Sequence, residues 1–469
     1  MTMFQYRPVV LAVLLGAAAA AVSAADRPLD RSQWLDPALT STSDDLRRVP
    51  VPKDYREIKG AIVIRNARLF DGTGTKARAV NMLIEGSHIA RIVPATEALS
   101  VPEGGEVLDV QGKTVMPGMI DLHTHLTYWE DSSEGADLSQ ADAALLGMER
   151  LRYFLESGIT SVRDVASHGE APFVLKRWVA DGRIPGPRVF AAGNLITGVG
   201  GHGAESDSAH TAPRYPDAAV YEANGADGFR LAVRQQFKRG ADLIKLASHF
   251  TAEEVGAAVD EAHSLGLKVT VDSETIYTQR AVEAGVDCVE HPLPRSDETI
   301  RMMARKGICA DITLVPYQYV TAAGGYNFST SRRFTLTNES IFAMARKLDA
   351  AGIKIGIGTD LVFGQYRYLP DPYIQELRNY QALGHKPADA LVEATRVNAE
   401  ILGMADRIGT AQVGKLADLI VVDGHPDESL EALNKIELVM VNGRVVVRDG
   451  RVFTPRHVPE KAPYSTAPG

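Results

Sequence analysis

Hydrophobic and polar positions form two kinds of pattern along the chain. From Ala61 to Val110, short segments of β-forming residues are broken by turn signals, and the same pattern returns near Gly409. After Pro117, apolar runs of strand length alternate with helical stretches over about 280 residues. This alternation predicts a parallel sheet covered by helices, and eight such units would close a barrel.

These patterns predict an α/β protein in which a TIM (β/α)8-type barrel is inserted in a small composite β-sandwich domain. The length of 469 residues suits two such domains. We expect the barrel over residues 117–403 and the sandwich from residues 58–116 together with 404–455. Residues 456–469 combine proline, charge and small residues without a period, which predicts an exposed tail.

The N-terminus has the pattern of a secretory signal peptide over residues 1–24. Arg7 precedes an apolar run from Val9 to Val22, and small residues end the segment at Ala24. A membrane anchor is the competing interpretation, but the run is short for a spanning helix and a processing site follows it. We therefore expect cleavage before Ala25, an N-terminal extension over residues 25–57, no stable membrane anchor after processing, and a periplasmic or secreted protein.

Composition and charge narrow the class of protein. Hydrophobic residues make up 45% and charged residues 23%, as in a globular enzyme with a large core. A net charge of -9 offers no basic surface, so nucleic acid is not an expected partner. Cys288 and Cys309 both lie in apolar segments, which favours two reduced core cysteines, while a disulfide between neighbouring strands stays open.

The clearest chemical motif opens the first expected barrel strand. Because side chains alternate along a strand, Asp121, His123 and His125 share one face, and the two imidazoles point the same way at the strand end. A pair of surface or core histidines is the alternative. The position directly after a β unit favours a metal site.

The segment from Met116 to His125 resembles the metal-binding opening of the amidohydrolase superfamily. Further segments are similar to its prolidase and imidazolonepropionase-like branch: Gly72–Thr75, Arg183–Thr197, Gly200–Gly203 and Gly414–Gly424. The resemblance spans nearly the whole chain. It implies a barrel enzyme in which divalent metal and water cleave an amide bond.

The resemblance also implies a modified lysine. Lys245 occupies the fourth-strand place at which the family carries a carboxylated lysine that bridges two metals. The modification is needed because an ammonium repels a cation, whereas a carbamate oxygen is an anionic ligand. The alternative is a lysine that extends toward solvent from a barrel strand or forms an ion pair.

Two further residues match ligand positions of the family. His291 ends the sixth strand and Asp360 ends the eighth, at the mouth where barrel enzymes keep catalytic groups. A core histidine and a helix N-cap are the alternatives. By the family pattern, Asp360 binds metal and takes the proton from the attacking water.

The fifth strand departs from this pattern, because Asp272 stands where the family supplies a histidine. A carboxylate can bind zinc, but it suits manganese or magnesium better than imidazole does. We expect two zinc ions. Manganese or another divalent ion is the alternative to zinc, and a single occupied metal site is the alternative to two.

Three other side chains are candidates for substrate contact. His202 lies in a glycine-rich loop after the third strand and is expected to polarise the carbonyl or bind substrate, unless it is a mobile loop histidine. His249 shares the strand face of Lys245 and is a weaker candidate, and Tyr317 after the seventh strand is weaker still.

The resulting expectation is hydrolysis of a dipeptide (Xaa-Pro-like) or an N-acyl amino acid by a metal-activated water. The alternative reaction is ring opening of a cyclic amide or imidazolone, in which Glu274 could act as acid or base. An alternative of another class is a metal-dependent binding protein with impaired catalysis, suggested by Asp272 alone and opposed by the retention of Lys245 and Asp360. We expect a homo-oligomer.

Overall fold

The computed structural model describes residues 60–128, 139–204, 218–322, 335–362 and 364–453, which all belong to one compact unit, Val51–Gly469. The expected signal peptide, N-terminal extension and C-terminal tail lie outside the described residues. Within the described part of the chain, every helix is too short or too polar to cross a bilayer.

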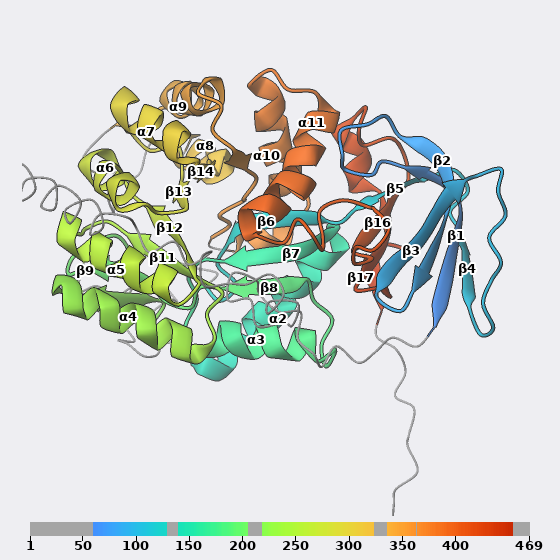
Figure 1. Ribbon diagram of the computed structural model, residues 1–469, viewed down its shortest axis with the longest axis horizontal. Helices are drawn as coiled ribbons and strands as arrows, with labels where there is room; N and C mark the ends of the chain where they lie inside the picture. The colour runs from blue at the N-terminus through green and yellow to red at the C-terminus, as the bar shows by residue number, and fades with distance from the viewer. Residues whose placement is uncertain (1–59, 129–138, 205–217, 323–334, 363, 454–469) are drawn as a thin grey trace, which may run out of the picture. The chain divides into compact units, whose positions relative to one another are not determined.

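A nine-stranded mixed sheet is built from both ends of the described chain (Figure 1). Its first strands are β1 (Ala61–Leu69), β2 (Arg78–Glu85), β3 (His88–Pro94), β4 (Glu106–Asp109) and β5 (Thr114–Pro117), and its last are β16 (Leu419–Val422), β17 (Ile436–Val441), β18 (Arg444–Arg448) and β19 (Arg451–Val452). Antiparallel pairing of β5 with β16 joins the two groups, with Pro117 opposite Leu419. The composite sheet is therefore interrupted by everything between β5 and β16.

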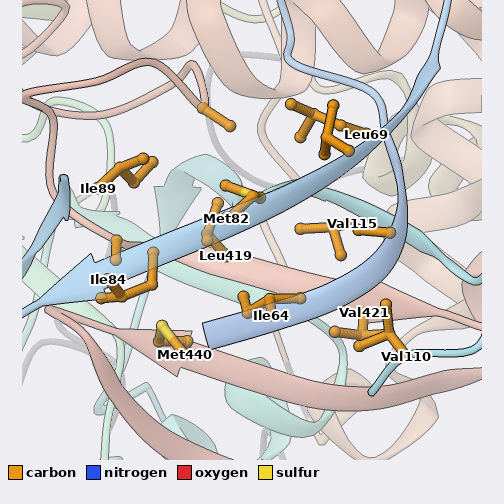
Figure 2. Packing of buried hydrophobic residues seen from close by; sticks show 14 residues of the cluster. Ile64, Leu69, Met82, Ile84, Ile89, Val110, Val115, Leu419, Val421 and Met440 are labelled. Atoms are coloured by element: carbon orange, nitrogen blue, oxygen red, sulfur yellow. The ribbon is translucent and has the colours of Figure 1, made fainter. Parts of the chain in front are cut away.

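This sheet encloses a hydrophobic core of its own. Figure 2 shows Ile64, Met82 and Ile84 from β1 and β2 facing Leu419 and Met440 from β16 and β17. An isolated bridge between His88 and Leu416 brings the edge of β3 back toward the segment before β16. Burial of apolar side chains on one face thus gives the sheet its sandwich form.

The barrel strands lie in two parallel sheets. One contains β6 (Met119–Thr124), β7 (Ile159–Asp164) and β8 (Arg188–Ala191), and the other runs from β10 (Val220–Ala223) and β9 (Leu195–Gly198) through β11 (Leu243–Ala247), β12 (Lys268–Asp272), β13 (Cys288–Glu290) and β14 (Cys309–Asp311) to β15 (Ile355–Gly356). Backbone bonds join them at both seams: the Asp242 amide donates to the Ala191 carbonyl over 2.9 Å, and Leu122 donates to Ile357 over 3.1 Å. The predicted TIM-type barrel within a β-sandwich is confirmed.

Helices follow the barrel strands and cover them. They are α2 (Gln140–Glu156), α3 (Ala171–Ala180), α4 (Gly225–Arg239), α5 (Ala252–Ser264), α6 (Thr275–Ala284), α7 (Asp297–Lys306), α8 (Leu314–Ala322), α9 (Asn338–Ala350), α10 (Asp371–Ala382), α11 (Pro387–Val392) and α12 (Asn398–Leu402). Short 3-10 turns occur at η4 (Gln365–Tyr368) and η6 (Leu430–Asn434), and η5 (Glu393–Val397) is a π-helical turn. The parallel strands direct their carboxyl ends to one mouth of the barrel.

The favoured interpretation of two reduced cysteines is wrong. Cys288 on β13 and Cys309 on β14 are direct register partners, their Cα atoms lie 4.5 Å apart, and their sulfur atoms form a disulfide. The register of these neighbouring strands brings the two side chains together, and register is a property of the closed barrel that neither segment reveals alone.

Candidate metal centre

Three side chains from the two ends of the barrel sequence meet at its mouth. His123 lies on β6 and His125 just beyond it, whereas Asp360 follows β15. Asp360 Oδ1 lies 3.1 Å from His125 Nε2 and 3.5 Å from His123 Nε2. One ligand atom from each of the three residues lies within 4.8 Å of the others. Two imidazole nitrogens and a carboxylate oxygen in this arrangement can hold a divalent transition metal.

The backbone of Asp360 fixes its carboxylate in this group. Its φ is 48°, a left-handed conformation that is uncommon for a residue other than glycine, and its amide donates to the His123 carbonyl over 2.8 Å. Burial by itself raises the pKa of Asp360, but the neighbouring imidazoles of His123, His125 and His291 lower the pKa below its ordinary value. Asp360 is thus a charged carboxylate that can bind a cation.

The His125 ring is oriented from both sides. Its Nδ1 lies 3.0 Å from the Ala166 carbonyl, to which it donates, and this leaves Nε2 to face Asp360. The Tyr128 ring stacks on it at 4.1 Å between centroids and 10° between planes. The Tyr366 hydroxyl accepts from the His125 amide over 3.0 Å and donates to its carbonyl over 2.8 Å. Such outer contacts fix the ring and tautomer of a metal ligand.

A second group of side chains surrounds Asp272 at the end of β12. Asp272 Oδ2 lies 3.2 Å from His291 Nε2 and 3.1 Å from His202 Nε2. Burial raises the pKa of Asp272, but His291 and His202 outweigh it and hold the pKa well below the usual range. His291 also connects the two groups, because its Nδ1 lies 3.9 Å from Asp360 Oδ2. The residues therefore form one continuous site.

Lys245 lies on β11 with only 1% of its surface exposed. Among the described residues its Nζ has no hydrogen-bond partner, and the same holds for the buried Oδ1 of Asp272. The Lys245 ammonium contributes to lowering the pKa of both His123 and Asp272, so its charge lies near both groups. A buried ammonium without a partner is costly, which indicates that the site is incomplete with protein atoms alone.

The structure brings two of the three expected substrate contacts beside the metal-ligand candidates. His202 borders Asp272 with 29% of its side chain exposed, and the Tyr317 ring lies 5.3 Å from the His291 ring. His249 instead packs beside Tyr277, with 5.1 Å between ring centroids. His202 and Tyr317 thus border the metal-ligand candidates.

Sequence reasoning missed the residues that orient the ligand candidates: Tyr128, Arg163, Glu290, Asp311 and Tyr366. Two of them carry a signal in the sequence. Glu290 directly precedes His291, and Arg163 lies in the buried barrel strand β7, where a charge requires a partner. Tyr366, in η4, contacts His125 from far along the chain, whereas Tyr128 lies only three residues after His125, where no sequence pattern marks it.

A barrel whose mouth gathers imidazoles, carboxylates and a buried lysine defines a class of metal-dependent hydrolases. The profile of the amidohydrolase family matches residues 114–446. The chain belongs to this family, as its motifs predict, and it is a metal-dependent amidohydrolase with a His/Asp metal site that acts on C–N bonds.

Known proteins similar to this chain differ in substrate. An imidazolonepropionase from Symbiobacterium thermophilum is 27% identical over 407 residues, which cover 78% of this chain and 89% of the relative. A Xaa-Pro dipeptidase solved with bound methionine is 28% identical with a TM-score of 0.72, covering 82% of this chain and 99% of that one. A prolidase complexed with N-methylphosphonate-L-proline is 28% identical with a TM-score of 0.71, covering 83% and 100%.

Proposed function

We propose that this amidohydrolase cleaves the amide bond of a dipeptide, Xaa-Pro-like, or of an N-acyl amino acid. The observation that carries the proposal is the convergence of His123, His125 and Asp360 at the barrel mouth, with Asp360 ionised and within reach of both rings. The similar prolidase and Xaa-Pro dipeptidase structures support the substrate class.

The donor atoms fit two divalent cations. His123, His125 and Asp360 would hold one ion, while His291 and Asp272 would hold the other, with a carboxylated Lys245 between them. The fit is supported by the buried Nζ of Lys245 and Oδ1 of Asp272, which lack protein partners among the described residues. Imidazole ligands favour zinc, whereas the Asp272 carboxylate raises the affinity of the site for manganese relative to zinc.

The chain's own residues then divide the work of hydrolysis. A divalent ion, when bound, polarises a carbonyl and makes water a nucleophile near neutral pH. Asp360 accepts the proton of the attacking water and passes it to the leaving nitrogen as the C–N bond breaks. His202 Nε2 lies 3.1 Å from Asp272, and as an imidazolium His202 would donate from Nδ1 toward the oxygen on which negative charge develops.

A panel of dipeptides and N-acyl amino acids, assayed with zinc and then manganese added back, tests the proposal. Release of free amino acid from at least one member is expected. Cleavage confined to cyclic amides would favour the second candidate reaction, ring opening of an imidazolone-type substrate. Binding without turnover of any compound would favour a catalytically impaired binding protein.

Ring opening is supported by one relative and one residue. The imidazolonepropionase shares 27% identity over most of its length. Glu274 is 1% exposed, follows β12, and accepts a hydrogen bond from Ser248 Oγ over 2.9 Å. A buried carboxyl there could exchange a proton with a ring nitrogen.

We expect Asp272→His to raise metal content per chain and to shift preference from manganese toward zinc, because imidazole is a softer, neutral donor. Asp272→Asn is the matched control: it keeps the size of the side chain, loses the charge, and should bind less metal than the wild type. Metal analysis of all three proteins after dialysis measures both effects. If the wild type and the two variants have the same metal content and the same preference between zinc and manganese, Asp272 lies outside the metal site.

Export and a homo-oligomeric state are also part of the proposal. The observation behind export is the signal-peptide pattern before Ala25. The intact mass of protein recovered from the cell envelope should correspond to a chain that begins at or near Ala25. A mass that retains residues 1–24 contradicts export by this route, and light scattering of the same sample reports the oligomeric state.

A further inference from the structure

A buried carboxylate lies directly behind the metal-ligand candidates. Glu290, at the end of β13, is fully buried. Its Oε2 lies 2.8 Å from His123 Nδ1, the ring nitrogen that does not face Asp360. Its Oε1 accepts hydrogen bonds from Arg163 Nη2, at 2.7 Å, and from Thr270 Oγ1. Each oxygen of Glu290 therefore has its own donors.

Glu290 is the ion-pair partner of a permanent cation. The Arg163 guanidinium is not deprotonated in proteins, and its Nη2 lies 2.7 Å from Oε1 of the fully buried Glu290 carboxylate. A buried guanidinium requires an opposite charge beside it. Arg163 also reaches Asp311 Oδ2, but at the longer distance of 3.3 Å, so Glu290 is its nearer charged partner.

An ionised carboxylate can only accept hydrogen bonds. The proton shared by His123 and Glu290 must then come from His123 Nδ1, and this leaves the lone pair of the neutral ring on Nε2. That nitrogen is the one 3.5 Å from Asp360 Oδ1. Glu290 therefore determines which nitrogen of His123 is available to a cation.

We propose that Glu290 is a positioning residue that fixes the tautomer of His123, with Arg163 and Thr270 fixing the orientation of Glu290. The inference rests on the proposed role of His123 as a metal ligand. The tautomer itself is measured in metal-free protein, so its outcome is independent of whether the proposed substrate is cleaved.

For Glu290→Gln, the nitrogen of His123 that carries the proton can be predicted, because an amide has one end that accepts and one end that donates hydrogen bonds. Two donors, Arg163 and Thr270, meet at the Oε1 position, so the amide oxygen belongs there. The amide NH2 then faces His123 Nδ1, which must become an acceptor. The ring proton moves to Nε2, and His123 loses the lone pair that points toward Asp360.

Nitrogen-15 NMR of metal-free protein with labelled histidine distinguishes the two tautomers, with the His123 signals assigned by their loss in His123→Asn. The wild type should carry the proton on Nδ1 and Glu290→Gln on Nε2. In the same pair, affinity for zinc should fall about 10- to 100-fold in the variant, the usual effect of losing an outer-shell partner.

Two variants separate hydrogen-bond chemistry from packing. Glu290→Asp still only accepts, so it should keep the proton on Nδ1 despite its shorter reach. Asp164→Asn changes another buried carboxyl, whose Oδ1 accepts from the Leu126 amide and Ser167 Oγ, and should leave both tautomer and zinc affinity as in the wild type. A wild-type His123 that carries its proton on Nε2 would overturn the inference even if no variant folds, and so would an unchanged tautomer in folded Glu290→Gln.

Discussion

Asp360→Asn is expected to lower kcat by about 10²- to 10⁴-fold, the usual contribution of a general acid or base. Asn cannot accept the proton of the attacking water, and it offers a weaker, neutral oxygen to a cation. Because Asp360 lies within 3.9 Å of three imidazoles, the loss combines a missing base with a weakened metal site. Steady-state kinetics on the substrate found in the panel measure the loss, and metal analysis of the same sample separates its two causes.

Asp164→Asn is the matched control for this prediction. Asp164 is also fully buried at a strand end, burial raises its pKa to about 7, and its Oδ1 accepts from Leu126 and Ser167. Asn keeps that accepting oxygen, so kcat should stay within a few fold of the wild type. Similar losses in both variants would mean that a buried carboxyl matters here only for packing.

Lys245→Ala is expected to remove about one metal ion per chain and to lower activity by at least about 100-fold, because the proposed anionic bridge between two ions would be lost. A short carboxylic acid such as propionate, added in excess, should restore part of the metal content and part of the activity, because its carboxylate oxygens can occupy the space that the lysine side chain leaves. Carbon-13 NMR of wild-type protein grown with labelled bicarbonate should show the carbamate directly.

Lys268→Ala controls for the loss of a half-buried barrel lysine. Lys268 lies on the neighbouring strand β12, burial lowers its pKa, and its Nζ donates to the Ile401 carbonyl over 2.7 Å. This variant can lose stability but should keep its metal and gain nothing from propionate. Full metal content in Lys245→Ala, or no carbamate signal in metal-loaded wild type, would remove the lysine bridge from the proposal.

The fold was predictable because its signals are local. Alternation of apolar strands with helices predicts the barrel, and the return of β character near Gly409 predicts that the sandwich closes around it. The observed pairing of β5 with β16 agrees with this prediction. The disulfide was not predictable, because it depends on the register between β13 and β14, which neither strand specifies by itself.

The candidate site likewise contains residues that the sequence predicts and residues that only the structure identifies. His123, His125 and Asp360 stand in short motifs at strand ends, so strand alternation and family resemblance identify them together. Glu290 contacts His123 across 167 positions of sequence, and the Tyr366 contact with His125 spans 241. Only barrel closure produces such contacts, which is why a sequence motif names the ligand candidates and the structure names the residues that orient them.

Hydrolysis by this amidohydrolase is expected to depend on metal held at the barrel mouth. The most direct test of this dependence is activity on the best substrate of the panel, measured with metal content before chelation, after chelation, and after stepwise return of zinc or manganese. We expect activity to disappear with the metal and to return in proportion to the ions bound per chain, in the wild type but not in Asp360→Asn. Undiminished hydrolysis by protein that contains no metal would contradict this dependence on metal.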